Sequence, residues 1–258
     1  MYALTRGKML FLLILIVSSW GLALFSFIYY RERASQVPIS QPYRTDYSTH
    51  LSEVQPGTIK LPGPTTVGTM SVEEAISRRR SKREYLDKPL EAAQLSQLLW
   101  ASQGITESRW GLRTAPSAGG TYPLEVYVVV GERGVRGLAA GIYRYRPKDH
   151  AIVLIASGDS RAELSAASLN QPWVAKAPIV IVISAVYERT TRVYGSRGIR
   201  YVDMEAGHVG QNVYLIATGM GLGAVVVGAF HDEQIQQVLR LPKDEAPLYV
   251  IPVGYPKD

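Results

Sequence analysis

A run of basic residues is the first candidate for chemistry in this 258-residue chain. Arg79, Arg80, Ser81 and Arg83 lie almost side by side, with Lys82 among them. Guanidinium groups donate paired hydrogen bonds that match a phosphate, and a serine hydroxyl adds another donor. A solvated basic helix end is the other interpretation, since cations also stabilise a helix C-terminus, and the run alone favours it. The run therefore indicates a phosphate site only in company with other segments.

A second candidate is the loop Ala115–Pro123, which is rich in small residues and precedes an apolar run beginning at Leu124. Small residues let the backbone approach a flat ring closely, and glycine permits a positive φ. The hydroxyl and N–H groups of Ser117, Ala118 and Gly119 are therefore candidates to face the heteroatoms of a ring. A tight loop that simply enters a strand is the alternative.

The third candidate is the glycine-rich segment Gly219–Phe230. Its glycines are spaced as in a dinucleotide-binding G-x-G-x-x-G turn, but they follow a predicted helix and precede a predicted strand. A Rossmann turn requires the opposite order, with the strand first and the helix after the glycines. We therefore reject a Rossmann unit for this segment.

Composition limits the chemistry further. The chain has no Cys, which excludes disulfides, thiolate metal sites and Cys nucleophiles, so redox chemistry would require a cofactor. Its four His residues lack metal-ligand spacing, and we expect no metal. The net charge of +6 suits an anionic cofactor or membrane surface. Nucleic-acid binding is not expected, because no aromatic platform accompanies the scattered basic residues.

The elements that must position these segments mix helices and strands. Ser71 and Glu74 form a capping box that starts a helix running toward Arg80. Further helices are predicted over residues 91–103, 161–168, 200–220 and 232–239. Strands are predicted over residues 124–131, 141–145, 151–155, 178–186 and 247–253, and a strand or turn over 223–230. Because the order is not a strict β-α-β alternation, the pattern predicts an α+β domain.

An uncharged apolar stretch spans Met9–Tyr30. As a helix rising ~1.5 Å per residue it would be roughly 33 Å long, enough to cross a bilayer core. It predicts a membrane location through a single-pass anchor over residues 1–33, with a cleaved signal peptide as the alternative. Its orientation stays open because positive charges flank both ends. Recurring prolines predict an extended or loosely ordered tether over residues 34–69, and residues 70–258 form the main domain.

Taken in order, the three candidate segments resemble the FMN-dependent nitroreductase superfamily, and more closely its SagB-type branch of thiazole/oxazole-forming peptide dehydrogenases. Gly141–Tyr145, Gln171–Val174 and Glu205–Asn212 add to the resemblance, which covers Ser71–Pro256. The resemblance implies a nitroreductase-like FMN-binding fold, a central mostly antiparallel sheet flanked by helices. The one transmembrane helix predicted from hydrophobicity precedes this fold and lies outside the resemblance. It also implies an FMN oxidoreductase that transfers hydride through flavin N5 to or from a small-molecule or peptide substrate. NAD(P)H is the candidate electron donor.

The same resemblance implies a homodimer with FMN at the subunit interface. It places the phosphate and ribityl chain on the basic run: Arg79, Arg80, Ser81 and Arg83. It places the pyrimidine side of the ring on Ser117, Ala118 and Gly119. Val227 and Gly228 would lie near N5, with the Gly228 N–H as a donor to it.

The long predicted helix would form the core of that dimer. Gly207 and Gly210 are small enough for close packing between helices. An apolar face for the contact would come from Val209, Val213, Ile216 and Ala217. Polar residues of the same helix need partners if they are buried, and these could lie across the dimer: Glu205, Gln211 and Asn212.

One position departs from the branch. In its peptide-azoline dehydrogenases a Lys-Tyr pair before a Gly-x-Arg segment takes part in proton abstraction, whereas this chain has Val193 and Tyr194 there. A phenol without a neighbouring cation is a poor base at neutral pH, so azoline oxidation is in doubt. Tyr194 is the candidate catalytic residue, as a proton donor or a substrate contact, and a plain surface tyrosine is the alternative. A catalytically silent flavin-binding module on a membrane is the alternative function.

Overall fold

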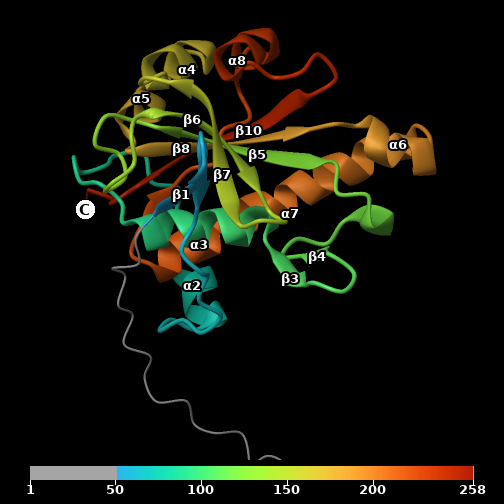
Figure 1. Ribbon diagram of the computed structural model, residues 1–258, viewed down its shortest axis with the longest axis horizontal. Helices are drawn as coiled ribbons and strands as arrows, with labels where there is room; N and C mark the ends of the chain where they lie inside the picture. The colour runs from blue at the N-terminus through green and yellow to red at the C-terminus, as the bar shows by residue number, and fades with distance from the viewer. Residues whose placement is uncertain (1–50, 258) are drawn as a thin grey trace, which may run out of the picture. The chain divides into compact units, whose positions relative to one another are not determined.

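The computed structural model describes residues 51–257, and a domain of helices around an eight-stranded sheet fills this range (Figure 1). The strands lie in the order β1-β2-β7-β6-β5-β8-β10-β9, and all paired neighbours are antiparallel. The strand bounds are β1 Ser52–Gln55, β2 Thr58–Lys60, β5 Leu124–Val130, β6 Gly141–Arg146, β7 Ala151–Ser157, β8 Ile179–Ala185, β9 Gly223–Ala224 and β10 Ala246–Gly254. The predicted α+β class with a mostly antiparallel sheet is confirmed.

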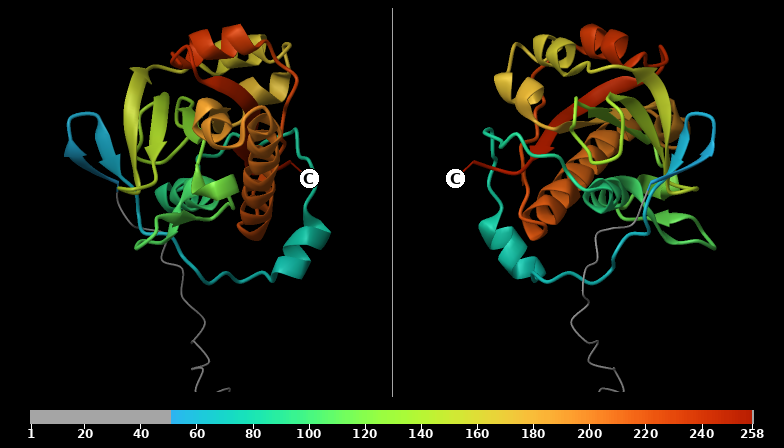
Figure 2. Two further views of the ribbon diagram at one scale, coloured as in Figure 1. Left: turned by 90° about the vertical axis from the view of Figure 1, so that its right-hand side faces the viewer. Right: turned by 60° about the vertical axis from the view of Figure 1, so that its left-hand side comes forward.

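Helices cover both faces of this sheet (Figures 1 and 2). One face carries α3 (Ala92–Gln103) and α7 (Arg197–Gly219), with α2 (Val72–Arg78) packed beside α7. The other face carries α4 (Arg161–Ala167), α5 (Pro172–Lys176) and α8 (Asp232–Leu239). Where β8 ends and β5 begins lie α6 (Glu188–Tyr194) and the short 3-10 turn η1 (Ala118–Gly120). Between α3 and η1 the chain forms a hairpin of β3 (Ile105–Glu107) and β4 (Leu112–Arg113).

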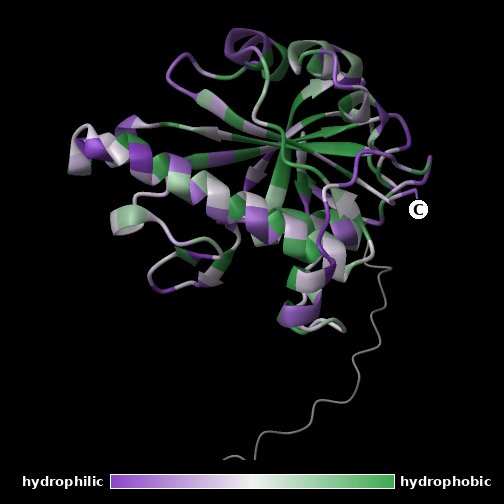
Figure 3. Ribbon diagram, turned by 180° about the vertical axis from the view of Figure 1, so that it is seen from behind, coloured by the Kyte–Doolittle hydropathy of each residue, from purple (hydrophilic) through white to green (hydrophobic). Residues whose placement is uncertain are grey.

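The central strands are apolar on both sides because both faces are covered. All seven residues of β8 are buried, and the sheet is the most hydrophobic layer in Figure 3. Alternate residues enter different cores, since side chains of a strand point to opposite faces. Ile181 packs in the cluster with α3 and α7, whereas Val182 packs in the cluster with α4, α5 and α8. Each such fully buried aliphatic side chain contributes about 1.5–3 kcal/mol to folding.

Local signals in the sequence set several helix ends. The Ser71 hydroxyl accepts a hydrogen bond from the Glu74 N–H at 3.1 Å and caps α2 as predicted. Gly104 ends α3, and α8 occupies the predicted residues. Gly195, with φ 56° and ψ −148°, separates α6 from α7, and this backbone geometry is accessible essentially only to glycine.

Part of the segment predicted as a tether, residues 34–69, belongs to the sheet. β1 and β2 fall inside that segment and extend the sheet at β7, where Ile59 pairs with Ile152. Beyond them the Thr65 N–H donates to the Gln97 side chain on α3 at 2.9 Å. The prolines did not prevent this pairing because none lies in either strand. The earlier part of the predicted tether lies outside the described residues.

The predicted membrane location needs correction. Between residues 51 and 257 no helix is both long and apolar enough to cross a bilayer. The longest helix there, α7, buries one side against the sheet and exposes charged residues such as Arg200 and Asp203, a pattern that hydrocarbon would not accept. The apolar stretch Met9–Tyr30, on which that expectation rested, lies outside the described residues.

Candidate functional site

The basic run lies against the glycine-rich segment, although the two are far apart in the sequence. Ser81 forms a bridge with Ala224 of β9, and the Lys82 N–H donates to the Ala224 carbonyl at 2.9 Å. Gly223 is required at this contact, since a Cβ there would lie 2.7 Å from the Lys82 side chain. The first and third candidate segments therefore form one continuous surface.

Tyr214 of α7 is the residue that links these two segments. Its hydroxyl lies 2.9 Å from the Ser81 hydroxyl and accepts a hydrogen bond from the Val226 N–H at 2.9 Å. The Arg79 guanidinium lies over the Tyr214 ring, 4.9 Å from its centroid. Sequence reasoning missed Tyr214, because a tyrosine in an amphipathic helix carries no signal of what its hydroxyl will reach.

The three arginines of the basic run have different surroundings. Arg80 donates to the carbonyls of Ser77 and Arg79 at 2.9 and 2.7 Å, which matches the helix-end interpretation. Arg79 lies over Tyr214, and Arg83 lies over the Trp173 ring at 5.4 Å. A guanidinium stacked on a ring keeps its edge donors available for an anion. Arg79 and Arg83 are therefore the better phosphate ligands of the three.

The N–H groups of the run Val225–Gly228 differ in what they bond. Val225 donates to the Pro252 carbonyl, Val226 to Tyr214, and Val227 to the Val250 carbonyl. No acceptor for the Gly228 N–H exists among residues 51–257, and Gly228 is exposed. Of the two residues predicted to lie near a flavin N5, only Gly228 has a donor to offer, while Val227 is committed to its pairing with β10.

The small-residue loop presents free donors of its own. Gly119 has φ 60° within η1, and the Ser117 hydroxyl accepts a hydrogen bond from the Tyr122 N–H at 2.9 Å. Within the described chain the N–H groups of Ala118 and Gly119 have no acceptor, because they start the 3-10 turn. Two adjacent N–H groups and a side chain no larger than methyl suit close approach by a flat, electron-rich ring edge.

Helix α6 brings Tyr194 over this loop. The Thr190 and Thr121 hydroxyls lie 2.7 Å apart, and Arg189 donates to the Glu125 carboxylate at 2.6 Å and the Tyr122 carbonyl at 3.1 Å. With α6 held in this way, a Cβ on Gly119 would lie 2.7 Å from the Tyr194 hydroxyl oxygen. The candidate catalytic residue and the candidate ring-binding loop therefore share one location. Tyr194 is 38% exposed there.

Helix α7 packs against its own sheet with the side that the sequence analysis assigned to a dimer contact. Val209, Val213 and Ala217 are buried against the sheet in the same protomer, and Gly210 faces Tyr249 and Val226. Asn212 donates to the carbonyls of Ala101 and Thr114. The expected apolar dimer face is therefore an internal face, because the sheet covers it.

A different face of α7 remains uncovered. Met204, Gly207, His208 and Gln211 share one side of the helix and are exposed. A Cβ on Gly207 would meet no atom within 4 Å.

The two parts of the candidate site contact α7 at different positions along the helix axis. The basic run meets the helix at Tyr214. The small-residue loop is connected to the helix at Glu205, which accepts from Gln103, and Gln103 in turn accepts from Arg113, which lies over the Tyr122 ring of the loop. Nine positions of an α-helix correspond to a rise of roughly 14 Å. Within one protomer the phosphate-type and ring-type donors are therefore well separated.

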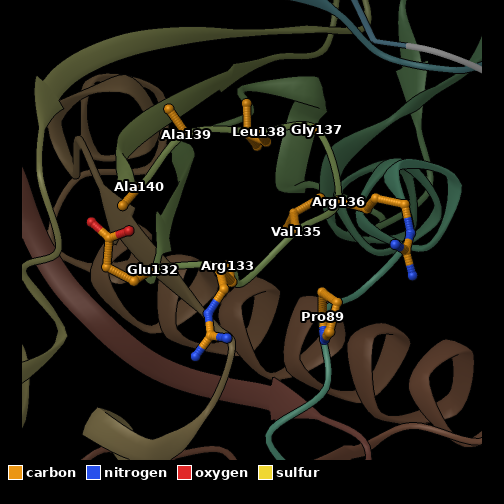
Figure 4. Close-up of a pocket in the computed structure, with 9 residues that line it drawn as sticks. All are labelled: Pro89, Glu132, Arg133, Val135, Arg136, Gly137, Leu138, Ala139 and Ala140. Carbon is orange, nitrogen blue, oxygen red and sulfur yellow. The ribbon is translucent and has the colours of Figure 1, made fainter.

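A pocket of about 460 Å³ lies elsewhere on the domain (Figure 4). Pro89 and the loop carrying Arg133, Arg136 and Leu138 line it. Both arginines already pair with carboxylates, Arg133 with Asp87 and Arg136 with Glu91. None of the predicted site residues reaches this pocket, so it adds nothing to the candidate site.

Comparisons with known proteins show the family of this chain. The nitroreductase family model matches residues 76–255. A nitroreductase-like protein of Methanocaldococcus jannaschii is 50% identical over 196 residues, which cover 76% of this chain and 95% of that protein. The microcin B17-processing protein of Escherichia coli is 26% identical over 196 residues, 73% of this chain and 72% of that protein.

A solved structure is similar as well. The crystal structure of a nitroreductase-like protein from Ralstonia eutropha matches with a TM-score of 0.68 and 33% identity. The match covers 78% of this chain and 90% of that one.

Proposed function

This chain belongs to the nitroreductase family, and from that premise we propose that it catalyses hydride transfer between a small-molecule or peptide substrate and FMN. The protein is an oxidoreductase, and FMN is its cofactor. Bound FMN supplies a ring that accepts and donates hydride, and the protein supplies binding, orientation and exclusion of water.

One observation supports the assignment of cofactor residues: the Tyr214 hydroxyl joins Ser81 of the basic run to Val226, two residues before the free Gly228 N–H. Tyr214 holds the run Val225–Gly228 and Ser81 together through its hydroxyl. Arg79 and Arg83 keep open edge donors near the same surface. A phosphate would bind the open edges of Arg79 and Arg83 beside the Ser81 hydroxyl, and the Gly228 N–H, which the fold leaves unpaired, would donate to the ring.

A homodimer completes this proposal. The Ala118 and Gly119 donors lie roughly 14 Å from the Tyr214 level along α7, so a second copy would bring its own small-residue loop to the first copy's basic run. The uncovered face of α7 around Gly207 is a suitable contact surface, since no side chain of the same protomer occupies it.

Dimerisation has a direct test at Gly207. Gly207→Leu adds a bulky side chain where the protomer has space, and it raises helix propensity. Sedimentation should show a folded monomer. Its visible absorbance should show that FMN binding is lost. Gly63→Leu is the control, because Gly63 also meets nothing within 4 Å. A Gly207→Leu protein that is still dimeric would show that this face is not the contact.

We infer the substrate class from similarity to relatives more than from any single residue. Peptide processing is suggested by similarity to the microcin B17-processing protein. Val193 is 61% exposed beside Tyr194 and cannot supply a cation, so a reaction that needs a strong base at this position is disfavoured. A small acceptor, with NAD(P)H as electron donor, is therefore the substrate class we propose first.

The full-length protein tests the function directly. Purified protein should carry the visible absorption of FMN and lose it anaerobically when NADH or NADPH is added, then regain it with a quinone or nitroaromatic acceptor. Bound FMN without turnover on any of these compounds would favour the catalytically silent module. A colourless protein that takes up no added FMN would overturn the assignment.

The phosphate residues have a matched control in the same chain. Arg79→Ala with Arg83→Ala should weaken FMN binding strongly, because each removes a charge-assisted donor. Arg133→Ala with Arg136→Ala removes the same charge at the distant pocket and should leave FMN affinity unchanged. Equal affinities for the two double variants would refute the phosphate assignment.

A further inference from the structure

Helix α6, which carries Tyr194, lies at the periphery of the domain beside the start of α7 (Figure 1). Of its seven residues, all within the described range, only Thr190 is buried. A helix this short is marginal by itself, and burial of apolar side chains contributes little to holding it. Its first attachment is the Tyr187 hydroxyl, which donates to Asp203 of α7 at 2.7 Å. The place of α6 therefore depends on polar contacts.

Two consecutive residues of α6 contact two consecutive residues of the small-residue loop. Arg189 donates to the Tyr122 carbonyl at 3.1 Å, and the Thr190 hydroxyl lies 2.7 Å from the Thr121 hydroxyl. Thr190 is 1% exposed, so this second contact is shielded from water. Both loop residues directly follow η1, and the contacts therefore fix α6 relative to the candidate ring-binding donors.

Tyr194 follows these contacts by one turn of helix. Thr190 and Tyr194 are four residues apart, so they share one face of α6 and lie about 6 Å apart along its axis. Thr190 meets Thr121, and Tyr194 lies over Gly119, two residues earlier in the loop. A tilt of α6 at its attachment would therefore move the phenol relative to the loop.

Arg189 also attaches α6 to the sheet. Its other terminal nitrogen donates to the Glu125 carboxylate of β5 at 2.6 Å, and the second oxygen of Glu125 pairs with Arg144 of β6 at 2.9 Å. A planar guanidinium that donates to two acceptors in fixed directions restricts orientation more than a single ionic contact. Because Arg144 remains, Glu125 keeps a cationic partner when Arg189 is replaced.

We propose that Arg189 is a positioning residue for the reaction, which orients α6 so that the Tyr194 hydroxyl lies over the small-residue loop. This inference rests on the proposed function, in which Tyr194 donates a proton to the substrate or contacts it. Arg189 acts through Tyr194 from the side of α6 that faces Tyr122 and Glu125. Without its two bonds α6 can tilt away from the loop, and the phenol moves with it.

Arg189→Met tests the role, because methionine is also unbranched and suits a helix but has no donor. Amide exchange of Thr191 and Gly195 in the FMN-free protein should become about tenfold faster, as expected for the lost hydrogen bonds. The kcat should fall roughly tenfold, since a small displacement of a reacting group costs rate steeply. The Kd for FMN should change less than about twofold. Arg189→Lys keeps one donor and should restore part of the exchange protection and part of the kcat.

Arg192→Met is the matched control. Arg192 belongs to the same helix and pairs with Glu188 one turn away, so its ion pair attaches α6 to no other element. This variant removes the same charge and should leave both amide exchange and kcat at the wild-type values.

A double variant shows whether Arg189 acts through the phenol. In a Tyr194→Phe background the hydroxyl is already absent, so Arg189→Met should cause no further loss of kcat. A purely structural role of Arg189 would instead lower kcat by the same factor in both backgrounds.

The failures of the two proposals are distinguishable. A wild-type protein that takes up no FMN overturns the proposed function, and the positioning role with it. In a wild type that binds FMN and turns over, three results would overturn the positioning role alone: wild-type exchange and kcat in Arg189→Met, equal losses in Arg192→Met, or a full further loss in the double variant. Faster exchange together with a kcat loss that disappears in Tyr194→Phe would support it.

Discussion

The Tyr194 hydroxyl lies directly over Gly119, so closely that a Cβ on Gly119 would be 2.7 Å from its oxygen. Real Cβ atoms do not approach a neighbour this closely, so a side chain on Gly119 would require the Tyr194 ring to shift away. The contact joins α6 to η1 and fixes where the phenol can act.

Gly119→Ala should displace Tyr194 and weaken FMN binding. The added methyl meets the phenol, and alanine at φ 60° costs about 1 kcal/mol of stability. Gly111→Ala has the same backbone cost at φ 68° but meets nothing within 4 Å. We expect both variants to lose similar stability in urea unfolding and only Gly119→Ala to lose FMN affinity. Equal FMN affinities would show that the loop does not touch the cofactor.

Tyr194→Phe should lower kcat roughly 100-fold if the hydroxyl donates a proton to the substrate. The ring would keep its edge-to-face packing on Tyr201, whose centroid lies 5.2 Å away, so FMN affinity should not change. Tyr201→Phe is the control, since no hydrogen bond of its hydroxyl exists in the described part of the chain. Full activity of Tyr194→Phe with both donor and acceptor saturating would leave Tyr194 a surface residue.

Tyr214→Phe should separate the basic run from the run Val225–Gly228. The Val226 N–H would lose its acceptor, which costs about 1–3 kcal/mol when the group stays buried, and Ser81 would lose its partner. FMN affinity should fall roughly tenfold, read from quenching of flavin fluorescence. Tyr249→Phe is the control, because within residues 51–257 its hydroxyl has no hydrogen bond. Comparable losses from the two variants would exclude a specific role for Tyr214.

Asp159→Asn should lower the free energy of unfolding at neutral pH, and this loss should shrink as the solution becomes acid. Burial alone would raise the pKa of Asp159, but hydrogen bonds from Arg161 and from the Glu132 N–H outweigh it and lower the pKa from 3.8 to about 2. A depressed carboxyl pKa stabilises the folded state above pH 3.8, and this contribution is lost as the pH falls through about 2.

Urea unfolding at several pH values checks this sign. The wild type should be more stable than Asp159→Asn at pH 7, and the two free energies of unfolding should converge between pH 4 and pH 2. A gap that stays constant over this range would mean that the Asp159–Arg161 pair does not titrate as the geometry implies.

Part of the candidate site could be predicted because its signals are local. The capping box at Ser71, the stop at Gly104 and the glycine turn before β9 each depend on residues within one or two turns of chain. The roles of the basic run, the small-residue loop and Tyr194 remain predictions that the mutations above test. The pairing of β2 with β7 inside the predicted tether could not be foreseen, since proline frequency does not specify pairing partners.

The sequence by itself determined most of the central strands and the helices α2, α3, α4, α7 and α8, to within a few residues at their ends. Periodicity and caps act over a few residues, so they can be read without the fold. Only the tertiary structure decided that Tyr214 joins Ser81 to Val226 and that Tyr194 lies over Gly119. Such contacts depend on sheet register and on the rotation of α7, where a shift of one residue turns a side chain by about 100°.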